Sequence, residues 1–480
     1  MENLDIKTVS KRSVHGIFAL ASRTFLLQSF NFVTFLVISI ILSAGELGIY
    51  TAVVAIQRVI SFFTDFGLGA ALVQKKEELK REDLKTAFTL QSAVTLAIFL
   101  IFFIFAGQIK SFFNLTDAGE RLLIALVFTI FLSSFKTIPS ILLERKINFS
   151  RLVIPQIIES IVFNIVLIVL ALNKFGIDSY TFAFLISSLI GIPVYYYVSP
   201  WKPGVGIDRS SLRDLKYGIQ FQAKNVLATV KDDFLTVILV KFLPFNQIGY
   251  IGFAQKIAFF LYRYIVDSVT KVTFSSYSRL QENKNFLKLA IEKSLFFTTL
   301  IVFPLLSGLI IISTQLIKYF PGWGSKWEPA VLSLIFFCLN ALVSSVSGVL
   351  VNVLDATGRV KTTLKLMVVW TTLTWVLTPM SIYLWGFNGV AIASFTVTLS
   401  IFLTIYLVKK VIDFELIKSI YKPVIATAIM VVTTFVISAF FVQSLATLVF
   451  VIILGGGIYI FSIYLIAGKE ILEDAKKIFI

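Results

Sequence analysis

QIGYIGFAQKIAFFLYRYIVDSVTKVTFS, residues Gln247–Ser275, is the stretch that decides the fold. It is apolar enough and, at 29 residues, long enough to cross a bilayer with some tilt. It nevertheless carries Lys256, Arg263, Asp267 and Lys271, whose spacings of seven, four and four residues place them on one helical face. A charge at mid-bilayer costs roughly 2.5–3.5 kcal/mol on insertion scales, so this face is expected to line a polar cavity.

A simpler interpretation of the same four residues stays open. The two lysines can reach opposite membrane interfaces along their aliphatic stems, while Arg263 pairs with Asp267 one turn further on. This interpretation explains the lysines better than it explains Arg263, which lies near the middle of the span.

Composition places the whole chain in the membrane. Of 480 residues, 57% are hydrophobic and 15% charged, and the mean hydropathy is +0.90. Apolar windows of about 20 residues recur with short polar gaps, which predicts helices rather than the alternating strands of a membrane barrel. A single cysteine, Cys338, and a single histidine, His15, exclude an intrachain disulfide and argue against a Cys/His metal centre.

The pattern predicts an all-α protein with fourteen membrane helices. Their approximate ranges are 17–42, 46–72, 85–106, 121–143, 153–172, 179–198, 217–243, 247–273, 291–313, 329–353, 361–384, 388–408, 421–442 and 445–466. Lys and Arg gather in every second gap, as in the five basic residues between 75 and 85, whereas the turn Ser43–Gly45 has none. The positive-inside rule then puts both termini in the cytoplasm, so the net charge of +16 does not indicate nucleic-acid binding.

The chain also repeats itself. ELGIY at Glu46–Tyr50 and QIGYI at Gln247–Ile251 align on Gly48 and Gly249, which are 249 − 48 = 201 residues apart. Both segments follow a short outer turn and run inward, which predicts parallel repeats related by an axis along the membrane normal. We expect an N-lobe at 1–198, a cytoplasmic linker at 199–216, a C-lobe at 217–410, and two appended helices with a cytoplasmic tail at 411–480.

Charged residues inside the predicted spans concentrate in the first two helices of each repeat, although Lys136 and Glu159 also lie in the fourth and fifth spans. If the lobes pack face to face, the four repeat-starting helices line one cleft. The basic residues are Arg23, Arg58, Lys224, Lys231, Lys256 and Arg263, and the acidic residues with them are Asp65, Asp232 and Asp267. A purely structural role, in which Asp232 and its neighbour Asp233 neutralise nearby lysines, is the alternative for the acidic residues.

Three stretches resemble bacterial polysaccharide (O-unit, Wzx-type) flippases of the multidrug/oligosaccharidyl-lipid/polysaccharide exporter superfamily. They are DFGLGAALVQ at Asp65–Gln74, PSILLERKINFSRL at Pro139–Leu152 and NVLDATGRVK at Asn352–Lys361. Each motif is loose, but their joint order is fairly specific, and the resemblance covers the whole chain in helix number, repeat and topology. It implies a MATE-like two-lobe transporter with a central cationic cavity that opens alternately to each side.

The same resemblance implies the substrate, an isoprenoid-diphosphate-linked oligosaccharide. The six basic residues then become candidate ligands for its diphosphate, and Asp65, Asp232 and Asp267 become their charge partners or carboxylates that couple transport to H⁺ or Na⁺. No resident cofactor is expected. The expected partners are the polyprenyl-diphosphate-linked glycan, membrane lipids and the polymerase and other glycan-assembly proteins, with the transporter itself a monomer.

Other functions are weighed against this one. A cation-coupled multidrug exporter shares the superfamily, but its helices usually number twelve and its cavity is usually acidic. A polytopic glycosyltransferase or polymerase needs a large outer loop with acidic residues, whereas Ser43–Glu46 is too short to hold a site. No Walker motif or nucleophile elbow supports an enzyme. A scaffold of an assembly complex has no need of mid-membrane arginines.

Overall fold

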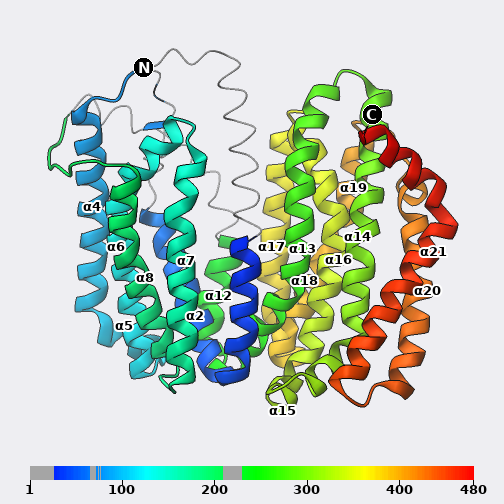
Figure 1. Ribbon diagram of the computed structural model, residues 1–480, viewed down its shortest axis with the longest axis horizontal. Coiled ribbons are helices and arrows are strands. Elements are labelled where there is room, and N and C mark those ends of the chain that lie inside the picture. The colour runs from blue at the N-terminus through cyan, green and yellow to red at the C-terminus, as the bar shows by residue number, and fades with distance from the viewer. Residues whose placement is uncertain (1–25, 65–71, 74, 76, 209–229, 480) are drawn as a thin grey trace. The chain divides into compact units, whose positions relative to one another are not determined.

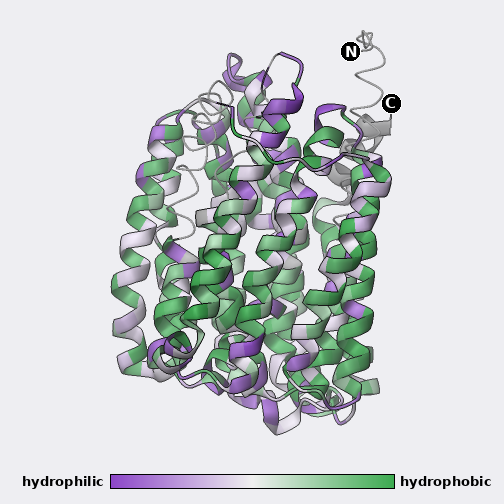
Figure 2. Ribbon diagram, turned by 90° about the vertical axis from the view of Figure 1, so that its left-hand side faces the viewer, coloured by the Kyte–Doolittle hydropathy of each residue, from purple (hydrophilic) through white to green (hydrophobic). Residues whose placement is uncertain are grey.

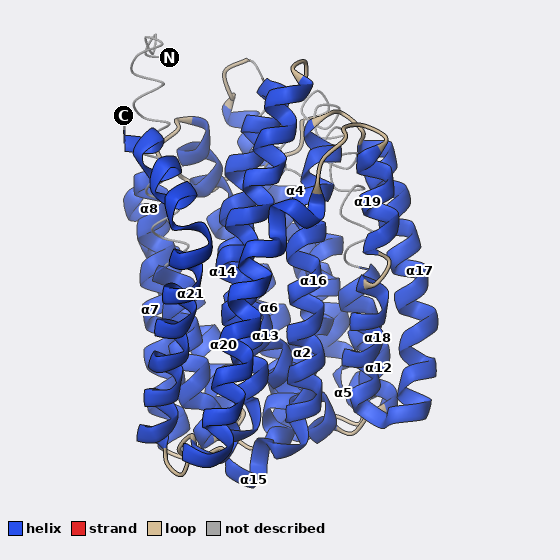
Figure 3. Cartoon of the chain, turned by 90° about the vertical axis from the view of Figure 1, so that its right-hand side faces the viewer, coloured by secondary structure: helices blue, strands red, loops and turns tan. Residues whose placement is uncertain are grey.

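The computed structural model consists of helices joined by short loops, and no strand occurs among the residues it describes (Figure 3). The described residues are all of 1–480 except 1–25, 65–71, 74, 76, 209–229 and 480. The all-α prediction is therefore confirmed.

The chain divides into two compact units, Met1–Gly249 and Tyr250–Ile480 (Figure 1). The first contains the helix Leu26–Ile41, α2 (Ala44–Thr64), α4 (Arg81–Ile104), α5 (Ala106–Phe113), α6 (Asp117–Arg145), α7 (Phe149–Leu172), α8 (Asp178–Val198), the π-helical turn η2 (Val230–Phe234) and α12 (Leu235–Phe242). The boundary lies inside α13 (Phe245–Leu280), so its first turn belongs to the first unit and the rest to the second.

The second unit continues with long helices of similar character. They are α14 (Lys284–Tyr319), α15 (Gly324–Trp327), η3 (Glu328–Ala330), α16 (Val331–Ala356), α17 (Val360–Trp385), η4 (Gly386–Asn388), α18 (Gly389–Thr398), α19 (Ile401–Lys409), α20 (Leu416–Phe441) and α21 (Leu445–Phe479).

Among the described residues, nine helical stretches are long and apolar enough to cross a membrane, and the chain is a multi-pass membrane protein. One of the nine, Val360–Lys409, holds three α-helices, because η4 separates α17 from α18 and two residues separate α18 from α19. Hydrophobic residues cover the helix bodies, while hydrophilic residues collect at their ends and in the loops (Figure 2). A helix lies in each of the fourteen predicted ranges, but the number of membrane crossings stays a prediction.

The start of α2 shows how local sequence sets a helix end. Glu46 accepts hydrogen bonds at Oε2 from the Ser43 backbone N–H and hydroxyl, each at 2.8 Å, and the Ser43 Oγ accepts from the Glu46 N–H at 3.2 Å. This reciprocal pair is a capping box, which satisfies backbone donors that a helix leaves unpaired at its first turn. It ends the preceding helix and begins α2 within a four-residue turn.

The two sequence-repeat segments meet at their glycines. A Cβ atom added to Gly48 would lie 1.7 Å from the carbonyl oxygen of Phe245, and one added to Gly249 would lie 1.9 Å from that of Ala44. The contact is reciprocal, since each glycine touches the residue four positions before the other. Because neither residue has a side chain, the backbones of α2 and of the first turn of α13 come into direct contact.

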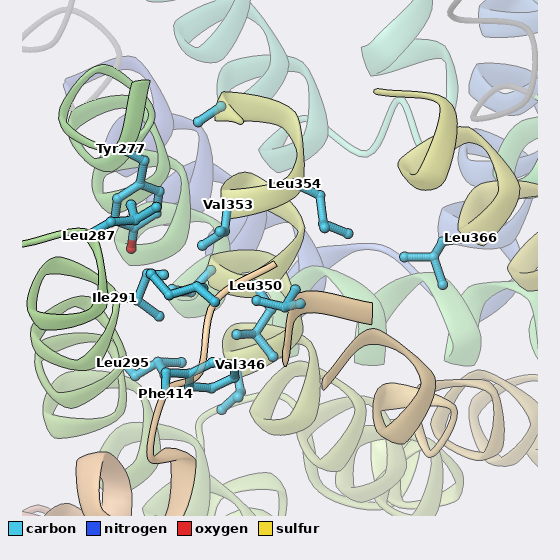
Figure 4. Close-up of a cluster of buried hydrophobic side chains, with 14 residues drawn as sticks. Tyr277, Leu287, Ile291, Leu295, Val346, Leu350, Val353, Leu354, Leu366 and Phe414 are labelled. Atoms are coloured by element: carbon cyan, nitrogen blue, oxygen red, sulfur yellow. The ribbon is translucent and has the colours of Figure 1, made fainter. Parts of the chain in front are cut away.

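Each unit has its own buried core. In the first, Leu84, Phe88, Ile138 and Ile141 from α4 and α6 form a cluster against which Trp201 packs. In the second, fourteen buried residues, among them Tyr277, Ile291, Leu350 and Phe414, join α13, α14 and α16 with the segment before α20 (Figure 4). Both clusters interlock neighbouring helices, which fixes the side chains that project elsewhere.

The described part of the predicted linker, residues 199–208, is bound along the start of α4. The ring of Trp201 meets Phe88 edge-on with centroids 5.2 Å apart, and the Gly206 N–H donates to the Thr89 hydroxyl at 3.0 Å. The Asp208 N–H donates to the Thr86 hydroxyl at 2.9 Å. The two compact units divide the chain after Gly249. The predicted lobe and linker boundaries stay a prediction.

Candidate functional site

The predicted cationic residues are only partly visible. Arg23, Asp65 and Lys224 lie outside the described residues, and the side chain of Asp232 also does. Arg58 and Lys231 lie in the first unit on α2 and η2, and Lys256, Arg263 and Asp267 lie in the second unit on α13.

Arg58 forms an ion pair with Asp233, the residue that follows the predicted partner Asp232. Its Nη1 lies 3.5 Å from Oδ1 of Asp233, and their side chains are 62% and 22% exposed. At this distance and exposure the ion pair is weak, so the guanidinium keeps most of its donors available to a ligand. Asp233 projects from the π-helical turn η2, an insertion of the kind that often occurs at functional sites.

The charged face of α13 is exposed along its length in the second unit. Lys256, Arg263, Asp267 and Lys271 are all exposed, whereas Val266, on the neighbouring face of the helix, is buried. No ion pair joins Arg263 to Asp267, both of which the structure describes, and the role of each residue stays a prediction. The i,i+4 spacing permits such a pair, but the two side chains do not use it.

A polar cavity of about 580 Å³ lies within the first unit. Residues from α2, α4, α6, α7 and α8 line it, and of these sixteen residues ten are neutral and polar, three are charged and three are apolar. The charged residues are Lys136, Glu144 and Glu159. A cavity with this lining inside an apolar helical unit is a candidate functional site, because polar side chains between membrane helices are costly unless they serve a ligand, water or one another.

An ion pair stands at one side of this cavity. Lys136 on α6 donates from Nζ to Oε1 of Glu159 on α7 at 2.5 Å, and to the hydroxyl of Ser188 on α8 at 3.0 Å. The two charged side chains are 14% and 24% exposed. Gly191 on α8 makes room for the carboxylate, since a Cβ added there would lie 1.5 Å from Oε1. Three helices therefore hold the pair in one geometry.

Most hydroxyl groups of the cavity use their hydrogen on their own helix. Thr129 donates to the Leu126 carbonyl at 2.7 Å and Ser133 to the Ile130 carbonyl at 2.6 Å. Thr64, Thr137 and Ser187 make the same kind of bond to carbonyls three or four residues earlier. A hydroxyl whose hydrogen is used still has acceptor lone pairs, so these five groups present acceptors to the cavity.

Sequence reasoning had no means of selecting this cavity. The sequence shows Lys136 and Glu159 in successive spans, but it does not show that they face each other. The usable signal was a basic and an acidic residue at similar depth on the two sides of one helical hairpin. Together with a glycine on the next span, this pattern predicts a buried ion pair.

Two of the family motifs tie helix ends together rather than line this cavity. Arg145, which ends α6, donates from Nη1 to the carbonyl oxygens of Leu72 and Lys75, each at 2.7 Å. In the second unit, Asn352 on α16 donates to the Thr273 hydroxyl on α13 at 2.7 Å. The described residues contain no group of three or more His, Cys, Asp or Glu that could hold a metal ion.

Comparison with known proteins supports the assignment of the chain to a family. It is 21% identical over 75% of its length to the lipopolysaccharide biosynthesis protein WzxC of Escherichia coli, of which it covers 73%. It is 22% identical over 62% of its length to the succinoglycan biosynthesis transport protein ExoT of Rhizobium meliloti, covering 60% of that protein.

A solved structure titled lipid II flippase MurJ, in an inward closed conformation, is similar to this chain. The match covers 94% of this chain and 99% of the chain in the solved structure. The TM-score is 0.75 at 20% identity, which shows a shared fold. The model of one family, described as polysaccharide biosynthesis protein, matches residues 37–332, more than half of the chain. This chain therefore belongs to the family of polysaccharide biosynthesis proteins.

Proposed function

We propose that this protein is a flippase that moves an isoprenoid-diphosphate-linked oligosaccharide across the bacterial inner membrane for surface polysaccharide assembly, by alternating access. The observation that carries the proposal is the exposed basic face of α13, with Lys256, Arg263 and Lys271 on one side of a long helix. The family, and relatives named for lipopolysaccharide biosynthesis and succinoglycan transport, support the substrate class.

The chemistry of a diphosphate explains why such residues are needed. Its oxygens only accept hydrogen bonds and carry negative charge, and an arginine fork can donate to two of them at once. At an effective dielectric of about 20, one pair of opposite charges 4 Å apart is worth roughly 4 kcal/mol, which offsets part of the cost of removing the headgroup from water. Arg58, Lys231, Lys256 and Arg263 are the described residues proposed for this role.

Energy coupling is also part of the proposal. Asp267 is exposed one helical turn from Arg263 without forming an ion pair with it, so it is the described carboxylate proposed for coupling to H⁺ or Na⁺. The protein is proposed to act as a monomer and to hand its glycan to a polymerase on the far side. No step in this scheme makes or breaks a covalent bond.

Export of glycan by α13 variants tests the proposal. Arg263→Ala is expected to abolish surface glycan in a flippase-deleted host at normal membrane expression, and Arg263→Lys to keep part of it, since the charge survives but the bidentate fork is lost. Arg279→Ala is the matched control, because Arg279 is an exposed arginine in the last turn of the same helix. Normal export by Arg263→Ala would contradict the proposed role of this face.

Thiol labelling tests the proposed orientation. Single cysteines at Lys80, Ser210 and Lys410 are expected to be protected from an impermeant reagent in intact cells, and cysteines at Gly45 and Asn246 to react. Cys338 is buried, so the unmodified chain gives the background. Labelling of Ser210 from outside would overturn the orientation.

A further inference from the structure

We propose that the polar cavity of the first unit is a sugar-binding subsite, which receives part of the glycan headgroup rather than its diphosphate. This inference rests on the proposed function and names the part of the substrate that one described site would bind. The cavity is lined by Gln57, Ser133, Thr137 and Glu144, among others.

The direction of the hydrogen bonds separates sugar from phosphate. Five hydroxyl groups in the cavity donate to helix carbonyls, so only their acceptor lone pairs remain for a ligand. The carboxylates of Glu144 and Glu159 add further acceptors. A ligand that fits must therefore donate. A sugar carries several O–H donors, whereas a diphosphate oxygen has none to give, so the cavity favours the glycan.

Charge gives the same result. The lining residues carry one positive charge, on Lys136, and two negative charges, on Glu144 and Glu159, so their formal sum is −1. The single cation is already engaged, since Lys136 donates to Glu159 and to Ser188. A diphosphate would be repelled here, whereas a neutral polyol meets no charge repulsion on entering.

Size argues against a simple cation site. One water molecule takes about 30 Å³ of liquid volume, so a cavity of about 580 Å³ has room for many waters and is much larger than a single ion needs. It falls instead in the range of roughly 300–1,000 Å³ that is usual for organic ligands. Ile130, Ile141 and Phe184 add apolar surface against which the C–H faces of a sugar ring can pack.

The amides complete the fit. Gln57, on α2, and Gln91, on α4, line the cavity, and Gln57 donates from Nε2 to Ser61 at 3.1 Å while its carbonyl oxygen remains an acceptor. A planar amide can donate to one sugar oxygen and accept from the next. Donors are thus few but present, which suits a ring that carries both O–H groups and ether oxygens.

Binding to the purified full-length protein tests the proposal with three probes. They are the lipid-linked oligosaccharide extracted from a flippase-deleted host, the free oligosaccharide released from it by mild acid, and farnesyl diphosphate, which has the diphosphate without sugar. The test variant is Ser133→Ala with Thr137→Ala, which removes two acceptors from one face of α6. Thr433→Ala is the control, since Thr433 makes the same hydroxyl-to-carbonyl bond at 2.8 Å on α20, in the second unit and away from the cavity.

We expect the double variant to weaken binding of the lipid-linked oligosaccharide by roughly two- to tenfold for each acceptor lost, to weaken the free oligosaccharide likewise, and to leave farnesyl diphosphate unchanged. The control should bind all three probes as the unmodified protein does. Unchanged affinity for both sugar-containing probes, or equal weakening of all three probes, would overturn the subsite.

Two further outcomes would also decide against it. If Na⁺ but not K⁺ stabilises the unmodified protein, and the double variant loses only this effect, the cavity is a cation site. If the unmodified protein binds farnesyl diphosphate and the lipid-linked oligosaccharide with equal affinity but does not bind the free oligosaccharide, the subsite is wrong while the diphosphate role of the basic residues stands. Failure to bind any probe would overturn the proposed function and the subsite with it.

Discussion

Gly48→Ala is a substitution for which the structure predicts a large effect from one added methyl group. The new Cβ would lie 1.7 Å from the carbonyl oxygen of Phe245, whereas Cβ atoms essentially never approach within 3.0 Å. The start of α2 and the start of α13 must therefore separate by at least 3.0 − 1.7 = 1.3 Å at this point. The clash is with backbone, so no change of rotamer relieves it.

The cost follows from the overpacking that this movement produces. Adding atoms to a well-packed contact typically costs 1–3 kcal/mol, and a forced backbone shift belongs at the upper end, so we expect about 3 kcal/mol. For a unit of about 250 residues, 1 kcal/mol corresponds to roughly 2–4 °C, which predicts an apparent unfolding midpoint lower by about 6–12 °C. The measurement is the fraction of protein that stays monodisperse in detergent after heating.

Two glycines provide controls. Neither Gly107 on α5 nor Gly456 on α21 has an atom within 4 Å of an added Cβ. Alanine is the better helix former by about 1 kcal/mol, so Gly107→Ala and Gly456→Ala should leave the midpoint unchanged or raise it slightly. If Gly48→Ala behaves like these controls, the two helix starts are not in backbone contact and the reasoning fails.

A double substitution tests the reciprocity of the contact. Gly249→Ala alone requires a separation of 3.0 − 1.9 = 1.1 Å from the Ala44 carbonyl oxygen. The movement that accommodates one methyl group also accommodates the other. The variant Gly48→Ala with Gly249→Ala should therefore lose less stability than the sum of the two single losses, and strict additivity would show that the sites are independent.

Three further perturbations concern charged residues. Either Lys136→Met or Glu159→Gln should destabilise the protein by roughly 1–3 kcal/mol by leaving a partly buried charged partner unpaired, and the double variant should recover most of this in the same heating assay. Arg263→Ala should leave the unfolding midpoint within about 2 °C of the unmodified protein, because the side chain is exposed and surface substitutions change stability little. The Lys418 ammonium beside Glu415 lowers the pKa of that carboxyl. The ion pair therefore contributes fully to the free energy of unfolding above the ordinary carboxyl pKa, and this contribution is lost as the pH falls through the lowered pKa. Glu415→Gln should remove this part of the fall in the unfolding midpoint in acid.

Much of the fold follows from the sequence because membrane solvation acts locally. A run of apolar residues such as Leu84–Ile104 must bury its backbone polar groups within a helix whatever its neighbours are, and α4 occupies that range. The Ser43–Glu46 pattern also carries its own helix start, since all partners of the capping box lie within four residues. Features of this kind need no knowledge of packing.

The candidate site follows less well, because its geometry depends on which helices pack together. The partners of Lys136 lie 23 and 52 residues away, on α7 and α8, and no local rule selects them. The i,i+4 rule permits an ion pair between Arg263 and Asp267, which the structure does not contain. A spacing rule states which contacts are possible, while burial and competing partners decide which of them form.

The two described polar surfaces differ in a way that bears on selectivity. The basic face of α13 offers donors and positive charge, and the cavity of the first unit offers mainly acceptors and a formal charge of −1. A diphosphate is common to all lipid-linked glycans of this kind, so residues that bind it cannot distinguish one glycan from another. Discrimination has to come from groups that meet the sugar, and a rigid set of acceptors rejects a ligand whose hydroxyls point elsewhere, because buried acceptors are then left unpaired. Substitutions such as Ser133→Ala should accordingly change which glycan is exported, whereas substitutions on the basic face should lower export of every glycan alike.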